Sequence, residues 1–118
     1  MSDCIFCKIV AGAIACKKVY EDEDIFAFHD INPISPVHFM VVPKQHIASL
    51  AETDASQAEV LGKLFSKLGD LARGQGLTDG FRTIVNTGRV GQEEVYHLHV
   101  HVIGGPDRLG PMLVKHKE

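Results

Sequence analysis

The stretch His97–Ile103 reads HLHVHVI, with a histidine at every second position and aliphatic residues between the histidines. Successive side chains of a β-strand point to opposite faces, so this alternation predicts a strand with three imidazoles on one face and aliphatic side chains on the other. An imidazole can be a nucleophile, a general acid or base, or a metal ligand near neutral pH. We interpret the stretch as the centre of a functional site, because the polar face of an ordinary strand does not require three alternating histidines.

The composition is that of an ordinary globular protein with one domain, residues 1–118. Hydrophobic residues make up 45% and charged residues 23% of the chain. The formal net charge of −3 gives no general reason to expect a nucleic acid or a membrane surface as partner. The three cysteines do not suggest a disulfide framework, and the first residues lack the pattern of a signal peptide. We therefore expect a cytoplasmic protein.

The periodicity of the remaining chain predicts a sheet with one long helix. We expect a short helix at 5–10, strands at 18–21, 25–29, 38–42 and 81–86, and a long amphipathic helix at 54–73. Asp54 or Ser56 can cap the long helix, the latter together with Glu59. In the strand at 38–42, His38 shares a face with Met40, which places a fourth imidazole where it can meet the other three. In the tail, Leu109, Pro111, Met112 and Leu113 are expected to be apolar anchors.

Two shorter motifs leave alternatives open. Cys4 and Cys7 form a C-x-x-C pair, which suits a redox dithiol, half of a tetrahedral zinc site, or two packed thiols. Cys16 is expected to be a packed thiol. The segment 86–94 contains two glycines and leads into the histidine stretch, so its backbone N–H groups could hold a phosphate, although such a loop is often only a connection.

Several motifs together resemble the histidine triad superfamily of nucleotide-binding hydrolases and transferases. The resemblance to the histidine triad nucleotide-binding (Hint) branch covers nearly the whole chain. It rests on the histidine stretch, Asp30-Ile31-x-Pro33, His38-Phe39, Pro43-Lys44-x-His46-Ile47, Val85-Asn86 and Tyr96-His97. The ending Leu109-Gly110-Pro111-Met112-Leu113 is similar to the tails of bacterial members.

The resemblance implies an α+β fold, with an antiparallel sheet of about five strands, a long helix and a short N-terminal helix, and a homodimer in which two such sheets join. It implies a purine nucleoside phosphoramidase, which hydrolyses the P–N bond between AMP or GMP and an amine. His99 is then the nucleophile that forms a nucleotidyl-histidine, and His101 and His38 contact the phosphate and the reacting imidazole.

The same resemblance assigns nucleotide contacts. Asp30 binds the ribose hydroxyls, Asn86 contacts the sugar and phosphate, and Gln92, Glu93 and Glu94 lie in the phosphate loop beside His99 and His101. The base pocket is formed by Ile14, Phe28, His29, Ile31 and Met40. This chain departs from the family at Glu93, where the pattern has glutamine. A carboxylate repels phosphate, so we expect Gln92 to take the role or Glu93 to point away; lowered activity is the remaining alternative.

The resemblance also implies a structural zinc ion on Cys4, Cys7, His46 and His97, with no catalytic metal required. Three competing interpretations remain: a dinucleoside polyphosphate hydrolase of the same superfamily, a weakly catalytic nucleotide-binding module, and a metal-dependent enzyme that uses the three alternating histidines as ligands.

Overall fold

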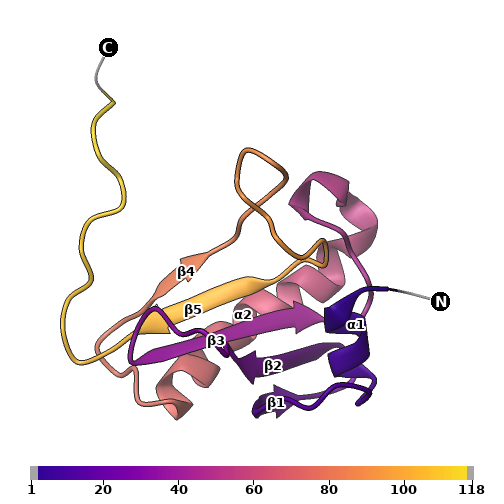
Figure 1. Ribbon diagram of the computed structural model, residues 1–118, viewed down its shortest axis with the longest axis horizontal. Helices are drawn as coiled ribbons and strands as arrows, with labels where there is room; N and C mark the ends of the chain where they lie inside the picture. The colour runs from indigo at the N-terminus through magenta and orange to yellow at the C-terminus, as the bar shows by residue number, and fades with distance from the viewer. Residues whose placement is uncertain (1–2, 117–118) are drawn as a thin grey trace.

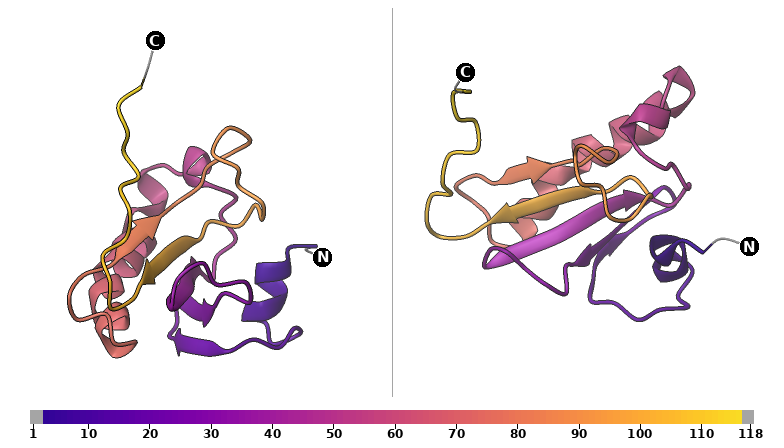
Figure 2. Two further views of the ribbon diagram at one scale, coloured as in Figure 1. Left: turned by 60° about the vertical axis from the view of Figure 1, so that its left-hand side comes forward. Right: turned by 45° about the horizontal axis from the view of Figure 1, so that its top comes forward.

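Residues 3–116, which the computed structural model describes, form a five-stranded antiparallel sheet with one helix against each face (Figure 1; Figure 2). The sheet order is β1-β2-β3-β5-β4. The elements in chain order are α1 (Ile5–Val10), β1 (Lys18–Glu21), β2 (Ile25–His29), β3 (Val37–Pro43), α2 (Ala58–Gly74), β4 (Arg82–Ile84) and β5 (Val100–Gly104). The expected α+β fold, with one long helix and a short N-terminal helix, is confirmed.

Alternation along β3 divides the interior into two layers. Phe39 and Val41 face α2, whereas Met40 and Val42 face α1. The layer under α2 is the larger, and its buried members are Ile25, Ala27, Phe39, Val41, Leu64, Leu68, Leu71, Ala72, Leu77, Val100 and Val102. The layer under α1 consists of Phe6, Ile9, Phe26, Phe28, Met40 and Val42. Burial of these apolar groups holds both helices on the sheet.

The long helix is preceded by a short 3₁₀ helix, Ala55–Gln57, so its expected start at residue 54 is corrected to Ala58. The Asp54 carboxylate accepts from the Ser56 N–H, and the Gln57 side chain accepts from the Asp54 N–H. Asp54 therefore caps the 3₁₀ helix, whereas α2 has Gln57 at its N-cap with no side-chain cap hydrogen bond, so neither Asp54 nor Ser56 with Glu59 caps α2 itself. The helix ends before Gly76, whose φ of +91° suits glycine. No helix among residues 3–116 is long and apolar enough to cross a membrane.

The ladder of the histidine stretch begins only at Val100, so the expected strand over residues 97–103 is corrected to Val100–Gly104. Its last pairing with β3 joins Val100 to Val41. Beyond that point β3 ends in Pro43, which has no N–H to donate. The Leu98 N–H donates instead to the Ile47 carbonyl at 2.6 Å. His97 and His99 therefore lie on a connection that is fixed by other contacts.

Two further expectations are also corrected. The strand expected at 81–86 spans only Arg82–Ile84, because β5 offers it just three paired residues before the chain turns into the loop at 86–94. Of the expected tail anchors, Met112 and Leu113 do not pack against the body of the chain, since Leu113 is 98% and Met112 is 56% exposed, and Pro111 is exposed as well, whereas Leu109 is half-buried beside residues 79–82. Arg82 donates to the Gly110 carbonyl at 2.7 Å, and beyond this the tail extends away from the sheet (Figure 1).

Candidate functional site

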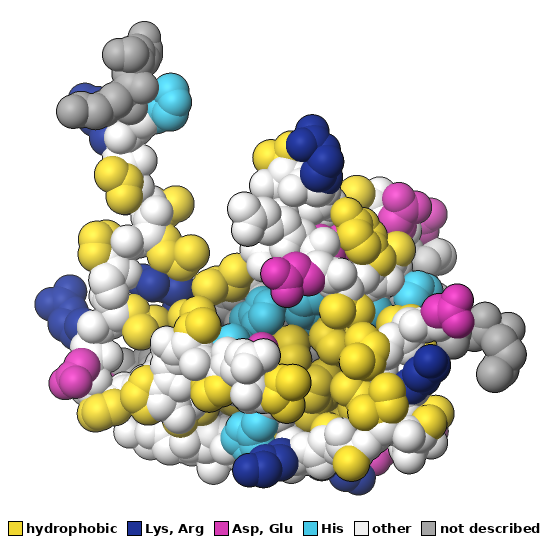
Figure 3. Space-filling view, viewed as in Figure 1, with side chains coloured by type: hydrophobic (Ala, Val, Ile, Leu, Met, Phe, Trp, Pro, Cys, Tyr) yellow, Lys and Arg dark blue, Asp and Glu magenta, His cyan; other side chains and the backbone are white. Residues whose placement is uncertain are grey.

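The sheet register brings His38 and the histidine stretch to one face. Met40 pairs with His101, so His38, two residues along the same face of β3, lies diagonally across from His101. The two rings approach with 2.9 Å between His38 Nε2 and His101 Nδ1. Figure 3 shows histidine side chains gathered in a hollow on this face, with hydrophobic side chains around them.

The hydrogen bonds of the first pair define its tautomers. The Ile34 N–H donates to His38 Nδ1 at 3.2 Å, so a neutral His38 carries its proton on Nε2. That N–H can donate to His101 Nδ1, and the neutral His101 then carries its own proton on Nε2. The backbone at Ile34 thus determines that His101 presents an N–H donor at its outer nitrogen.

Burial keeps this pair uncharged at neutral pH. Burial lowers the pKa of His38, and the Asp30 carboxylate, 3.4 Å from His38 Nε2, offsets only part of this effect. Burial, together with the neighbouring His99 and His38 rings, lowers the pKa of His101 to about 4. Both rings therefore act as neutral hydrogen-bonding groups.

His99 is oriented for nucleophilic chemistry. Its Nδ1 lies 2.8 Å from the His97 carbonyl oxygen, and because a carbonyl only accepts, Nδ1 is the donor. In the neutral ring this leaves the lone pair on Nε2. The ring is 93% buried, and its centroid lies 4.9 Å from that of His101. A nucleophile and a neutral N–H donor therefore stand side by side.

A cleft of about 660 Å³ opens over these rings. Its size suits a small ligand. None of the described residues that line it is a lysine or arginine, whereas Asp30 and Glu94 add carboxylates. An anion bound here is therefore held by uncharged N–H donors, close to the imidazoles.

Most residues expected to contact a nucleotide meet at this cleft, and the others lie behind or beside it. The lining includes Asp30, Ile31, His38, Met40, Asn86, Gln92, Glu94, His99 and His101. Phe28 is buried in the layer under α1, and Ile14 packs against the same layer. His29 lines an adjoining hollow that also has Asp30, Ile31 and His38 in its wall. Glu93 is buried and does not line the cleft.

The geometry of the loop separates Gln92 from Glu93. Gln92 has a φ of +61° and lines the cleft, a backbone conformation that costs a non-glycine residue about 1–2 kcal/mol. Gly91 is required, because a Cβ there would lie 2.5 Å from the Thr87 carbonyl oxygen. Glu93 turns inward and accepts from the Gly88 N–H at 2.9 Å, while its Oε2 is buried without a hydrogen-bond partner among the described residues.

A second cluster combines two thiols and two imidazoles. Sγ of Cys7 lies 3.3 Å from His46 Nδ1 and 3.5 Å from His97 Nδ1, and the two nitrogens are 3.2 Å apart. Sγ of Cys4 lies 3.4 Å from His97 Nδ1. A tetrahedral zinc ion would require roughly 3.3 Å between two nitrogens and about 3.6 Å between nitrogen and sulfur.

The tautomer of His97 also fits a metal. Its Nε2 donates to the Pro43 carbonyl at 2.7 Å, which leaves the Nδ1 lone pair directed at the thiols. Burial lowers the pKa of His97 and so favours the neutral ring that a metal needs. Cys4, Cys7, His46 and His97 could therefore hold a metal ion.

Asp30, His38 and His101 also lie close enough together to be considered as ligands. Their hydrogen bonds do not fit this role. A metal on His38 Nε2 would need the proton on Nδ1, where it would face the Ile34 N–H. The imidazoles of this cleft are thus arranged as donors and acceptors rather than as a metal site.

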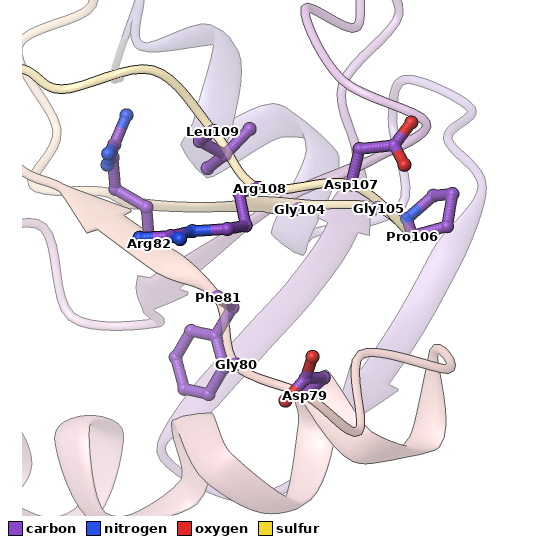
Figure 4. A pocket seen from close by; sticks show the side chains of 10 residues that line it. All are labelled: Asp79, Gly80, Phe81, Arg82, Gly104, Gly105, Pro106, Asp107, Arg108 and Leu109. Atoms are coloured by element: carbon purple, nitrogen blue, oxygen red, sulfur yellow. The ribbon is translucent and has the colours of Figure 1, made fainter.

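A smaller hollow of about 250 Å³ lies at the other end of β5 (Figure 4). Residues 79–82 form one side and residues 104–109 the other. None of its described lining residues is a histidine or a cysteine, so this hollow lacks the imidazoles that line the larger cleft.

Three features of the site were not anticipated from the sequence. Phe6 lies with its ring edge-on to His99, and the backbone at Ile34 and Pro43 sets two imidazole tautomers. The position of Phe6 between the two cysteines of the C-x-x-C pair was the only available signal. The backbone contacts leave no residue-type pattern.

Comparison with known proteins identifies the family of this chain. The family model described as "Scavenger mRNA decapping enzyme C-term binding" matches residues 3–113. Protein HitA of Neisseria gonorrhoeae is 47% identical over 106 residues, which cover 90% of this chain and 99% of that protein. An uncharacterized HIT-like protein of Synechococcus elongatus is 47% identical over 103 residues, covering 87% of this chain and 90% of that protein.

Solved structures agree with this. A HIT family hydrolase from Legionella pneumophila superposes with a TM-score of 0.88 at 38% identity, covering 92% of this chain and 98% of that chain. A HIT family hydrolase from Clostridium thermocellum gives a TM-score of 0.90 at 37% identity, covering 97% and 99%. The chain belongs to the histidine triad (HIT) superfamily, as its histidine stretch indicated.

The depressed pKa of His101 predicts a pH dependence of stability. The ordinary pKa of a histidine is 6.5, and that of His101 in the folded protein is about 4, so the unfolded chain binds more protons between these values. The free energy of unfolding should therefore fall as the pH is lowered from about 6.5 to about 4. Urea denaturation at pH 7, 6 and 5 should show a shallower fall in His101→Gln. Parallel curves for the two proteins would contradict the assignment.

Proposed function

We propose that this protein is a hydrolase that cleaves the P–N bond of purine nucleoside 5′-phosphoramidates through a nucleotidyl-histidine. The observation that carries the proposal is the pairing of His99, with its lone pair on Nε2, and neutral His101, with an N–H at its outer nitrogen, in one cleft. The HIT family hydrolases among its structural neighbours are consistent with a hydrolase.

The reaction divides into two displacements. In the first, the lone pair of His99 Nε2 forms a bond to the α-phosphorus, the P–N bond breaks, and the leaving nitrogen takes up one proton from the solvent to become an amine. In the second, a water oxygen bonds to phosphorus, the bond to His99 breaks, and the water releases one proton. The sum is phosphoramidate plus water giving nucleotide plus amine.

The neighbouring rings stabilise negative charge on the phosphoryl group. The His101 N–H donates to a phosphoryl oxygen, and His38, itself held by the Ile34 N–H, fixes the direction of that donor. Both groups are neutral, so they contribute hydrogen bonds to the phosphate and no positive charge. His38, His99 and His101 are thus the proposed catalytic residues.

The nucleoside is proposed to bind along the Asp30 side of the cleft. The Asp30 carboxylate suits the paired ribose hydroxyls, and the base would lie in the adjoining hollow beside His29 and Ile31. Met40, Phe28 and Ile14 form the apolar support behind it. Asn86, Gln92 and Glu94 would border the sugar and phosphate.

The charge of the cleft favours this substrate over a dinucleoside polyphosphate. A polyphosphate chain carries several negative charges, which proteins commonly match with arginine, lysine or metal ions. The described lining of this cleft contains neither basic residue and includes the Glu94 carboxylate. A single phosphate between a nucleoside and an amine is the better match.

We further propose that Cys4, Cys7, His46 and His97 hold a structural zinc ion. Four protein ligands leave no open position for water, so a bound zinc ion here supplies cross-linking of the N-terminal segment rather than activation of a nucleophile. The reducing environment of the cytoplasm suits thiol ligands, and we place the protein there.

A homodimer is the proposed assembly. β4 is a short edge strand, and Phe65 on α2 and Phe81 before β4 are 44% and 38% exposed, respectively. Exposed aromatic groups beside an unpaired edge suit pairing with a second copy. Light scattering that gave the mass of a single chain at micromolar concentration would refute the dimer.

The proposed nucleophile is tested with an adenosine 5′-phosphoramidate of a small amine. His99→Ala should lower the rate of AMP release at least about a thousandfold, and rapidly quenched wild-type protein should gain the mass of one AMP at His99. His116→Ala, which changes a histidine in the tail, is the matched control and should retain full turnover. Binding of AMP by wild-type protein without turnover of the phosphoramidate would refute the enzyme.

Glu93→Gln should keep or raise turnover. The amide retains an oxygen that accepts from the Gly88 N–H, and it removes a carboxylate charge from beside the phosphate loop. Glu93→Ala should lower the free energy of unfolding by about 1–3 kcal/mol, because it leaves the Gly88 N–H without its acceptor. A steep loss of turnover in Glu93→Gln would show that the carboxylate itself takes part in the reaction.

Protein purified without tags or chelators should contain about one zinc ion per chain. Cys7→Ser should lose it, as measured by mass spectrometry of the metal. Chelator treatment should leave measurable turnover, because the proposed chemistry uses an imidazole nucleophile. Absence of zinc would refute the metal site, and complete loss of turnover with chelator would favour a metal-dependent reaction.

A further inference from the structure

One side chain joins the Cys/His cluster to the candidate nucleophile. Phe6 lies between Cys4 and Cys7 in the chain, and its own ring is 94% buried. The ring centroid lies 5.0 Å from His99 with the planes at 88°, and 6.0 Å from His97 with the planes at 68°. The same ring packs against Phe28 at 5.4 Å. Phe6 therefore contacts a cluster residue, the proposed nucleophile and the interior.

The contact matters because His99 has few other constraints on its ring plane. Its Nδ1 hydrogen bond to the His97 carbonyl fixes one nitrogen and still permits the ring to swing about that contact. Phe6 meets the ring edge-on at 88°, and His101 meets it at 75°. These two flanking rings restrict the plane of the imidazole, and His99 and Phe6 both line the cleft.

The position of Phe6 depends in turn on the cysteines beside it. The helix α1 has only six residues, too few to be stable without tertiary contacts. Its ties to the sheet are the buried side chains of Phe6 and Ile9 and the approach of Cys4 and Cys7 to His46 and His97. A metal that joined these four residues would hold the chain in place on both sides of Phe6, at Cys4 and at Cys7.

We propose that Phe6 is a positioning residue for His99, and that occupancy of the Cys4/Cys7/His46/His97 cluster influences the reaction through it. The effect on rate rests on the proposed phosphoramidase activity, whereas the positioning of the ring does not. Metal binding in this protein then does more than stabilise the fold: through Phe6 it restricts the orientation of the proposed nucleophile.

The first test compares two phenylalanines of the same layer. Phe6→Leu should lower kcat for an adenosine 5′-phosphoramidate roughly tenfold and change KM less than about twofold. Phe26→Leu is the matched control, because Phe26 is equally buried and shows no ring contact with a histidine among the described residues. It should retain kcat. Phe6→Tyr, which restores the ring, should recover kcat to within about threefold.

Two kinetic outcomes would overturn the proposal. A rise in KM with unchanged kcat would make Phe6 a wall of the binding cleft only. Equal losses of kcat in Phe6→Leu and Phe26→Leu would reduce its role to general packing. Thermal denaturation of each variant shows whether the folded state is populated at the assay temperature, and Phe6→Tyr supplies the comparison if Phe6→Leu does not fold.

The second test joins Phe6 to the metal. Cys7→Ala should lower both metal content and kcat, and in the Phe6→Leu background it should lower kcat less than about twofold further, because both changes act through one contact. Independent, multiplying losses would show that the cluster does not act through Phe6.

A third measurement needs no substrate. Imidazole ¹⁵N–¹H spectra of the free protein should show displaced His99 signals in both Phe6→Leu and Cys7→Ala, and unchanged ones in Phe26→Leu. If wild-type protein does not hydrolyse the phosphoramidate, the proposed function fails while these spectra still decide the positioning role. Unchanged His99 signals in both variants would overturn it.

Discussion

The site depends on hydrogen bonds between imidazoles and the backbone. Each of three buried rings commits one nitrogen to a main-chain group: His38 to the Ile34 N–H, His97 to the Pro43 carbonyl and His99 to the His97 carbonyl. Because a neutral imidazole has one donor and one acceptor nitrogen, each commitment assigns the opposite role to the other nitrogen. Chemically identical side chains are thereby suited to the three proposed roles of nucleophile, relay and metal ligand.

This assignment also separates the proposed metal site from the proposed site of phosphoryl transfer. The Nδ1 lone pair of His97 faces the two thiols, whereas in the neutral ring of His99, two residues on, Nε2 carries the lone pair. The two rings, two residues apart in the chain, therefore lie in different surroundings. Pro43 contributes to both arrangements, since it ends the ladder and its carbonyl holds His97.

Much of the fold and of the site could be predicted from the sequence. Alternation in β3 and β5 located the two layers and placed His38 beside His101, because a period of two has few alternative interpretations. The predicted start of β5 was wrong, because Pro43 has no N–H to donate and the ladder between β3 and β5 is shortened at that end. The prediction for the end of the tail was wrong because apolar side chains in a sequence do not by themselves determine where they pack. The contact of Phe6 with His99 and the tautomers depend on tertiary geometry, which leaves no pattern in one sequence.

The Cys/His cluster has a consequence for the order of folding. Cys4 and His97 are 93 residues apart, so the cluster joins nearly the two ends of the described chain. Closing so long a loop is entropically costly until the intervening sheet has formed. During synthesis the N-terminal cysteines emerge first and remain without His97 until most of the polypeptide has followed. Binding of the proposed metal would therefore be a late event that favours chains whose sheet is already assembled.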